Sequence, residues 1–408
     1  MQLQHLHLEE FRVYRGLDIA LPAPGLRIAG PNGSGKSSVL EAIALISTAR
    51  SQRAGSDREL IRWGSGTDYG VPPYARCSVQ IASGERSSEI AIELEADSAG
   101  PNPDDQPQLA QGVVRKRCLV DGRAVRVLDI VGRLRTVTFS PEDVAIVSGP
   151  PAGRRRLIDI TISQLDRRYL QALSRYARVM SQRNGLLKSF ARDGVSAASA
   201  QARSQLLFWD DELVDAGSII VARRQELIAE LSVLAAVRYA ELAGGARFAL
   251  RYVTNVAPDG DSADDEAGDG AVLETDVVRA RFREALARRV AEEFRRGVTL
   301  VGPHRDEIQL ALDGIDLATF GSRGQQRLGI LSLKLAEADL MLAIGGEAPV
   351  LLLDDVLSEL DPERGQLLIE TVARFGAQAV ITATDRRWLD VPSLDELPLL
   401  QAGTGTLR

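Results

Sequence analysis

The chain has 408 residues and a formal net charge of −7, and 45% of its residues are hydrophobic. This length and composition are typical of a globular protein with one or two cores. No apolar run approaches the roughly 18 residues of a membrane-spanning helix, and residues 1–10 lack the basic start of a secretory signal. Two cysteines, Cys77 and Cys118, are too few for a disulfide framework. We therefore exclude membrane proteins and disulfide-stapled miniproteins, and we expect a cytoplasmic protein with reduced thiols.

The first predicted elements surround a glycine-rich loop. Residues 3–28 alternate between polar and apolar side chains in short segments, which predicts a β-hairpin or meander that leads into a buried strand at residues 26–29. Residues 37–47 carry an apolar stripe with helical spacing, so we predict a helix directly after the loop.

The loop matches the phosphate-binding pattern G-x-x-x-x-G-K-[ST] at every fixed position. Its backbone N–H groups and the N-terminus of the following helix predict a site for the β- and γ-phosphates of a nucleotide. We expect Lys36 to bridge phosphate oxygens and Ser37 to ligate Mg²⁺. The predicted ATP-binding residues are Gly30, Pro31, Asn32, Gly33, Ser34, Gly35, Lys36 and Ser37.

The middle of the chain is basic although the protein as a whole is acidic. Residues 113–192 contain 17 basic and six acidic residues, a local charge of +11, which can attract phosphate groups. A solvated, Arg-rich surface explains the same composition. Residues 97–112 and 257–270 lack apolar periodicity and are interpreted as surface insertions. The candidates for DNA contacts are Arg115, Lys116, Arg154 and Arg155.

Apolar residues at heptad spacing predict two long helices. One stripe runs from Tyr169 to Leu187 and the other from Trp209 to Leu234. Two such helices form either a short antiparallel arm, about 40 Å long for about 26 residues, or an ordinary helical subdomain. The sequence leaves both open.

A second anion-binding motif precedes a helix predicted after residue 322. The start Ser-x-Gly-Gln, formed by Ser322, Gly324 and Gln325, is either an anion-binding helix N-terminus or an ordinary cap. Because the loop at Lys36 already provides a phosphate site, the second motif makes sense if it serves the nucleotide of another subunit.

Two carboxylates follow an apolar run at residues 350–353, which predicts a buried strand that delivers acids at its C-terminal edge. We expect Asp354 to hold Mg²⁺ directly or through water. Asp355 lies where a general base for the attacking water belongs, and its alternative role is to cap the next turn. His304, in the segment Gly-Pro-His-Arg-Asp, is either catalytic or a structural hydrogen-bonding group.

Together these motifs resemble the ABC-type ATPase heads of the SMC class, and more closely the RecF family of bacterial DNA replication and repair proteins. The resemblance extends from about residue 3 to 385. It is carried by an ordered set of segments: Phe11-Arg12, the phosphate loop, Leu40 to Ile43, Ser51-Gln52-Arg53, Phe139 to Asp143, Gly149-Pro150, Arg154-Arg155, Asp159, Gln182 to Asn184, Leu187, Trp209-Asp210, Gly302 to Asp306, Ser322 to Arg327, Leu353 to Asp355 and Glu359 to Asp361.

The resemblance implies an α/β fold with an ABC/SMC-type P-loop ATPase head and an inserted, mainly helical arm lobe. Residues 1–150 and 291–408 are expected to form the head and residues 151–290 the arm. It further implies a homodimer that closes on ATP, with Ser322, Gly324 and Gln325 of one subunit at the nucleotide of the other. The expected partners are duplex and gapped DNA together with RecR and RecO, in the loading of RecA.

Two departures from the family pattern are compatible with slow ATP hydrolysis. Asp355 stands where ABC transporters have glutamate, and residues 381–385 contain no switch histidine. Glu142 is a weak candidate for the lid-loop position.

Two other classes of protein also contain such a phosphate loop. A transporter-type ATPase subunit does not account for the inserted basic region, and a small-molecule kinase does not account for the second motif at Ser322.

Overall fold

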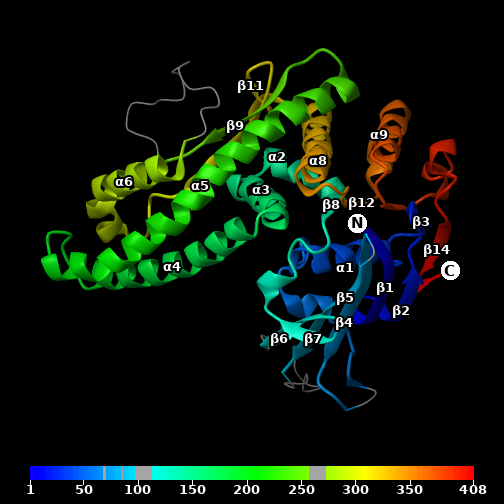
Figure 1. The fold of residues 1–408 in the computed structure, drawn as a ribbon, viewed down its shortest axis with the longest axis horizontal. Helices are drawn as coiled ribbons and strands as arrows, with labels where there is room; N and C mark the ends of the chain where they lie inside the picture. The colour runs from blue at the N-terminus through cyan, green and yellow to red at the C-terminus, as the bar shows by residue number, and fades with distance from the viewer. Residues whose placement is uncertain (68–69, 85, 98–112, 257–272) are drawn as a thin grey trace. The chain divides into compact units, whose positions relative to one another are not determined.

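A computed structural model describes residues 1–67, 70–84, 86–97, 113–256 and 273–408 (Figure 1). The chain forms two compact units: Met1–Asp143 with Glu337–Arg408, and Val144–Ala336. In the part of the chain that the structure describes, no helix is long and apolar enough to cross a membrane. Except for Asp97, the expected insertion at 97–112 lies outside the described residues, as does the whole of 257–270.

The first unit contains a six-stranded antiparallel sheet in which the predicted hairpin, β1 with β2, forms one side. Buried and exposed side chains alternate along β1, so one face of the sheet packs against the core and the other meets solvent. In spatial order the strands are β2 (Tyr14–Ala20), β1 (Gln2–Phe11), β4 (Tyr74–Ser83), β5 (Arg86–Ala96), β6 (Val114–Val120) and β7 (Arg123–Val125).

The second sheet of this unit is mostly parallel and contains both strands predicted near the nucleotide site. All residues of β3, β12 and β13 are buried, as expected for central strands of a parallel sheet. In spatial order the strands are β15 (Thr406–Leu407), β14 (Leu399–Gly403), β3 (Gly25–Ala29), β13 (Ala379–Ala383), β12 (Val350–Asp354) and β8 (Thr136–Phe139). Only β13 separates β3 from β12, and these strands run in parallel, so their carboxyl ends lie at the same edge.

The helix α1 (Lys36–Thr48) contacts strands of both sheets and is almost entirely buried. Its apolar side chains join those of β1, β3, β4 and β5 in one core. The predicted strand, loop and helix around the glycine-rich motif are therefore confirmed. The remaining helical segments of this unit are η1 (Asp57–Leu60), η3 (Val127–Asp129), η4 (Pro141–Asp143), η6 (Val356–Glu359), α9 (Pro362–Arg374), η7 (Arg386–Trp388) and η8 (Pro392–Leu394).

The second unit is mainly helical and includes a three-stranded sheet, β11-β10-β9. Its elements are α2 (Val144–Ser148), α3 (Pro151–Leu165), α4 (Arg167–Arg192), α5 (Ala200–Ala243), β9 (Phe248–Val253), α6 (Thr275–Arg296), η5 (Pro303–Arg305), β10 (Glu307–Leu312), β11 (Ile315–Asp316), α7 (Leu317–Phe320) and α8 (Arg323–Gly345), which continues into the first unit. The two predicted long helices are α4 and α5. A third helix, α6, packs on both of them, so the three form a bundle (Figure 1).

Arg183 joins the three helices to one another by ion pairs and to the segment that follows α6 by a hydrogen bond. Arg183 on α4 is 1% exposed and donates to Glu293 at 2.7 Å and to Asp210 at 2.7 Å. It also donates to the hydroxyl of Thr299 at 2.9 Å. Residues 291–336 belong to the same unit as these helices, whereas the expected arm ended at residue 290.

Candidate functional site

The phosphate loop joins the end of β3 to the start of α1. Gly33 and Gly35 have φ values of 78° and 105°, which only glycine adopts readily. The side chain of Lys36 is folded back over the loop, and its Nζ donates to the carbonyls of Gly30 at 2.6 Å and Pro31 at 2.9 Å. Burial lowers the pKa of Lys36, while the nearby Asp355 and Asp354 act in the opposite direction. The loop therefore holds a cation beside two carboxylates.

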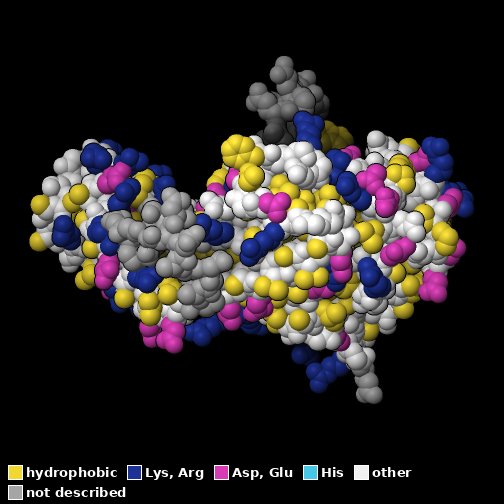
Figure 2. Space-filling model, turned by 90° about the horizontal axis from the view of Figure 1, so that it is seen from above, with side chains coloured by type: hydrophobic (Ala, Val, Ile, Leu, Met, Phe, Trp, Pro, Cys, Tyr) yellow, Lys and Arg dark blue, Asp and Glu magenta, His cyan; other side chains and the backbone are white. Residues whose placement is uncertain are grey.

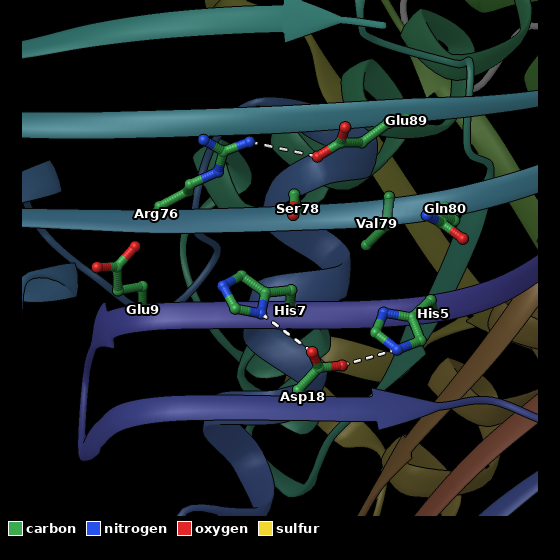
Figure 3. Close-up of a pocket in the computed structure, with 9 residues that line it drawn as sticks. All are labelled: His5, His7, Glu9, Asp18, Arg76, Ser78, Val79, Gln80 and Glu89. Atoms are coloured by element: carbon green, nitrogen blue, oxygen red, sulfur yellow. Dashed lines mark hydrogen bonds and ion pairs between the residues drawn. The ribbon is translucent and has the colours of Figure 1, made fainter. Parts of the chain in front are cut away.

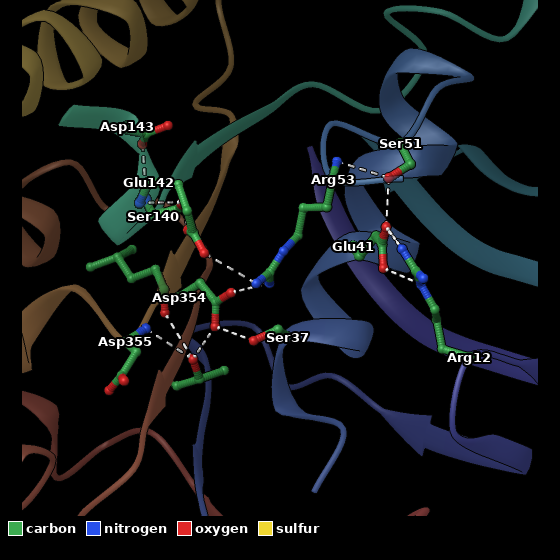
Figure 4. A network of polar contacts seen from close by, with 12 residues as sticks. Arg12, Ser37, Glu41, Ser51, Arg53, Ser140, Glu142, Asp143, Asp354 and Asp355 are labelled. Carbon is green, nitrogen blue, oxygen red and sulfur yellow. Dashed lines mark hydrogen bonds and ion pairs between the residues drawn. The ribbon is translucent and has the colours of Figure 1, made fainter. Parts of the chain in front are cut away.

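The expected Mg²⁺ ligands, far apart in sequence, meet in the structure (Figure 4). The hydroxyl of Ser37 donates to Asp354 Oδ1 at 2.9 Å, and the hydroxyl of Thr382 on β13 donates to the same oxygen at 2.8 Å. A hydroxyl and a carboxylate fit Mg²⁺, which takes one or two protein carboxylates and completes its shell with water and phosphate oxygens. Within the described ranges, no three His, Cys, Asp or Glu side chains form a metal site of their own.

Arg53 belongs to this site although the sequence assigned it no role. Its Nη1 donates to Asp354 Oδ2 at 2.7 Å, and its Nη2 lies 3.4 Å from Glu142 Oε1 (Figure 4). The backbone of Arg53 is fixed by Ser51, whose hydroxyl accepts from its N–H at 3.0 Å and donates to Glu41 at 2.5 Å. The only sequence signal was the triplet Ser51-Gln52-Arg53 among the residues of the family resemblance.

Asp355 has a left-handed backbone with φ of 52°. Its N–H donates to the Thr382 carbonyl at 3.2 Å, and its Oδ1 accepts from the N–H of Thr384 at 3.2 Å. Asp355 occupies the N-cap position of η6, but its side chain makes no capping hydrogen bond. The carboxylate is thus held beside Asp354 by Thr384, directly after β13, rather than by the turn that follows Asp355.

The second motif forms the N-terminus of α8 in the other unit. The side chains of Ser322 and Gln325 cap the helix reciprocally: Gln325 N–H donates to Ser322 Oγ at 3.2 Å, and Ser322 N–H donates to Gln325 Oε1 at 2.8 Å. Ser322, Gly324 and Gln325 are all exposed, and a side chain on Gly324 would meet open space. The predicted cap is present, and the motif remains accessible to another molecule.

The four candidates for DNA contact differ in their exposure to solvent and in their hydrogen-bond and ion-pair partners within the protein. The structure argues against a phosphate contact by Arg154, whose buried guanidinium donates to Glu307 at 3.0 Å and to three backbone carbonyls. Arg155 donates to the Asp306 carbonyl at 2.6 Å, and Lys116 pairs with Asp57 at 2.8 Å. Arg115 is 74% exposed.

These four residues show that a count of charges does not say which cations are exposed. Three of them make hydrogen bonds or ion pairs within the protein, namely Arg154, Arg155 and Lys116. Composition alone does not reveal these contacts. On the face seen in Figure 2, Lys and Arg side chains are interspersed with acidic ones rather than gathered in one patch. Of the four candidates, Arg115 is the most exposed, and its Nη2 lies 4.0 Å from Asp97 Oδ1.

A hollow on the solvent-facing side of the antiparallel sheet lies apart from these motifs (Figure 3). His5 Nε2 lies 2.7 Å from Asp18 Oδ1, and His7 Nδ1 lies 3.6 Å from Asp18 Oδ2. The hollow shares no residue with the phosphate loop or with the carboxylates at the end of β12.

His304 has the structural role. Its Nδ1 lies 2.7 Å from the Tyr176 hydroxyl, and its Nε2 lies 3.3 Å from the Thr299 carbonyl. The carbonyl can only accept, so Nε2 carries the proton and Nδ1 accepts from the tyrosine. Burial lowers the pKa of His304 to about 4.

This lowered pKa predicts acid sensitivity of the fold. Between its unfolded value near 6.5 and the folded value of about 4, the unfolded chain binds a proton that the folded chain does not, so stability falls as pH falls. The His304 contribution should decrease by about 2 kcal/mol between pH 7 and pH 5. Urea unfolding of the protein and of His304→Gln at both pH values measures it. A stability difference between the two proteins that does not change with pH would contradict this assignment.

Comparison with known proteins places these motifs in one family. Residues 2–395 match the family described as RecF/RecN/SMC N terminal domain. The DNA replication and repair protein RecF of Thermomicrobium roseum is 40% identical over 412 residues, covering 100% of both chains. Two solved structures of the recombination mediator protein RecF in the RecFOR pathway each have a TM-score of 0.80 and cover 100% of this chain. One, described as RecF-ATPrS, is 26% identical and is itself covered to 97%; the other, RecF-ATP, is 25% identical and covered to 98%. The expected ABC/SMC-type head fold is confirmed.

Proposed function

Because this chain belongs to the RecF family, we propose that it is an ATP-dependent DNA-binding protein of DNA replication and recombinational repair. In this proposal two copies dimerise on ATP, bind duplex DNA and single-strand/double-strand junctions, and hydrolyse ATP slowly in the cytoplasm, in association with the nucleoid. The RecF relatives described with ATP support the choice of nucleotide.

One observation carries the proposal: the hydroxyl of Ser37 and the carboxylate of Asp354 lie 2.9 Å apart at the end of a phosphate loop that also contains the buried Lys36. These two residues are separated by most of the chain, and they converge because β3 and β12 end at the same edge of one sheet. A glycine-rich turn without a nucleotide role would not require a hydroxyl–carboxylate pair at its end.

The residues of the site divide the work of ATP hydrolysis. Bound Mg²⁺ would neutralise the charge that develops on the phosphates. Ser37 and Asp354 hold the metal, and Lys36 binds phosphate oxygens once it leaves the Gly30 and Pro31 carbonyls. Asp355 accepts the proton of the attacking water. Arg53 donates to Asp354 Oδ2 and so orients this carboxylate.

The general-base role of Asp355 predicts that its replacement by asparagine slows ATP hydrolysis without preventing ATP binding. Asp355→Asn should retain ATP binding and lower the hydrolysis rate by about 10²- to 10⁴-fold, because the amide cannot accept a proton from water. Phosphate release under single-turnover conditions measures the rate. Asp361→Asn is the matched control, since Asp361 caps α9 and asparagine caps a helix equally well. Unchanged turnover in Asp355→Asn would remove this residue from the base role.

DNA binding is proposed to depend on phosphate contacts, and the described residues include no zinc site that would read bases. If about six phosphates are neutralised, affinity should fall roughly a thousandfold between 50 and 200 mM salt. Fluorescence anisotropy with a labelled gapped duplex, in the presence of ATP, measures this dependence for two unrelated DNA sequences. Affinity that depends on sequence and ignores salt would contradict the proposal.

RecR and RecO are the proposed protein partners, and promotion of RecA loading at junctions is the proposed outcome. The description of solved RecF relatives as recombination mediators of the RecFOR pathway supports this choice. Co-sedimentation of RecR with the ATP-bound protein on gapped DNA tests it, and RecR on the same DNA without this protein is the control. A RecR that sediments equally without this protein would exclude the partnership.

A further inference from the structure

Two buried hydroxyl groups beside the phosphate loop have no hydrogen-bond partner in the described part of the chain: Tyr14 Oη and Ser34 Oγ. The side chains are 0% and 2% exposed. Native proteins rarely leave a buried hydroxyl without a partner, because the group loses its bonds to water and gains none in return. Ser34 is a residue of the loop and belongs to the proposed ATP site. Tyr14 lies outside the motif and has no assigned role.

The Tyr14 hydroxyl lies against the backbone of the loop. Tyr14 begins β2, directly after the tip of the β1–β2 hairpin. A β-carbon on Gly35 would lie 2.6 Å from the Tyr14 hydroxyl oxygen and 2.8 Å from Val13 Cγ2. Gly35 is the N-cap of α1 and directly precedes Lys36. The hairpin tip therefore supports the point where the loop becomes the helix.

The hydroxyl is available as a neutral donor at neutral pH. Burial raises the pKa of Tyr14 to about 12. Around a bound triphosphate, a glycine-rich loop turns its N–H groups toward the phosphates. Its carbonyls then point away from the phosphates and need other donors. A hydroxyl beneath the loop can donate to one of them.

We propose that Tyr14 is a positioning residue for the nucleotide: its hydroxyl donates to a backbone carbonyl of the phosphate loop when a nucleoside triphosphate is bound. The hydrogen bond is made in the nucleotide-bound arrangement of the loop and is missing in the arrangement described above. A bond made in only one of two arrangements shifts the equilibrium toward that one, so the hydroxyl contributes to nucleotide affinity and not to the stability of the free protein. This inference rests on the proposed ATP site.

Tyr14→Phe tests the inference because it removes the hydroxyl and keeps the buried ring. We expect the melting temperature without nucleotide to stay the same or rise, since an unpaired buried hydroxyl is removed. We expect the Kd for Mg-ATP, measured by isothermal titration calorimetry, to rise about fivefold, as for the loss of one hydrogen bond. Tyr74→Phe is the matched control: its hydroxyl, on β4 of the same sheet, donates to Glu9 at 2.6 Å, and its loss should leave the Kd unchanged.

Two outcomes would overturn the inference. In the first, Tyr14→Phe binds Mg-ATP as tightly as the unaltered protein. In the second, affinity and the nucleotide-free melting temperature fall together, which shows that the hydroxyl already supports the fold of the free protein. If the unaltered protein itself fails to bind Mg-ATP, the proposed function fails instead, so the two failures can be told apart.

Discussion

Lys36→Met is expected to abolish ATP binding, with the Kd for Mg-ATP weakened beyond about a hundredfold. Lys36 is the only lysine of the loop, and its side chain is buried. Water therefore cannot take over its contacts with the phosphates when the ammonium group is removed. Loss of a hydrogen-bonded charge pair at a buried site costs about 3 kcal/mol or more, which corresponds to this change in affinity. Isothermal titration calorimetry with Mg-ATP measures it, and nucleotide-dependent DNA binding should disappear in the same variant.

The control for Lys36→Met is the stability of the protein without nucleotide. Lys36 donates to the carbonyls of Gly30 and Pro31, so the variant also loses two hydrogen bonds of the loop. Lys36→Arg retains a cation that reaches these carbonyls but carries a planar group where a compact ammonium is needed. We expect Lys36→Arg to fold normally and to bind ATP weakly. Full affinity in Lys36→Met would contradict the assignment of the loop as the ATP site.

Ser322→Arg is expected to leave ATP binding by the monomer nearly intact and to block nucleotide-dependent dimerisation. The hydroxyl is exposed at the start of α8, where a second copy is proposed to bring its triphosphate, and an arginine side chain there fills the space that the phosphate needs. Sedimentation velocity with saturating Mg-ATP measures the dimer, and calorimetry measures ATP binding by the same variant.

Two further substitutions of Ser322 distinguish an effect on dimerisation from an effect on the helix cap. Ser322→Arg removes the acceptor for Gln325 N–H, which costs about 1 kcal/mol of local stability. Ser322→Asp keeps an acceptor for this N–H but places a negative charge against the partner's phosphates, so it should fold normally and fail to dimerise. Ser322→Ala loses the cap without adding bulk or charge, and should dimerise better than either. A Ser322→Arg protein that still dimerises with ATP would rule out the shared site.

The sequence predicted the parts of the site whose information is local. The pattern Gly30 to Ser37 fixes a loop between strand and helix because glycine and lysine are required at set positions. The apolar run before Asp354 also predicts its element locally, because a short continuous run of apolar residues is typical of a buried strand. The two carboxylates follow this run directly in the sequence. The structure confirms both elements and brings Ser37 and Asp354 together.

The sequence did not predict contacts that depend on how distant segments pack. Arg53 reaches Asp354 across 301 positions of the chain, and no periodicity or spacing links the two residues. Arg154 belongs to a basic stretch by composition, but the fold buries its guanidinium against Glu307 and three carbonyls. Charge counts record how many cations a segment has, whereas burial decides how many of them remain available to DNA.

The central claim is that two copies complete each other's nucleotide site and that only the pair holds duplex DNA. Analytical ultracentrifugation with saturating Mg-ATP, with and without a gapped duplex, tests it most directly. The account predicts a monomer without nucleotide, a dimer with Mg-ATP, and co-sedimentation of DNA with the dimer alone. A protein that stays monomeric in saturating Mg-ATP and still binds the duplex with equal affinity would contradict it.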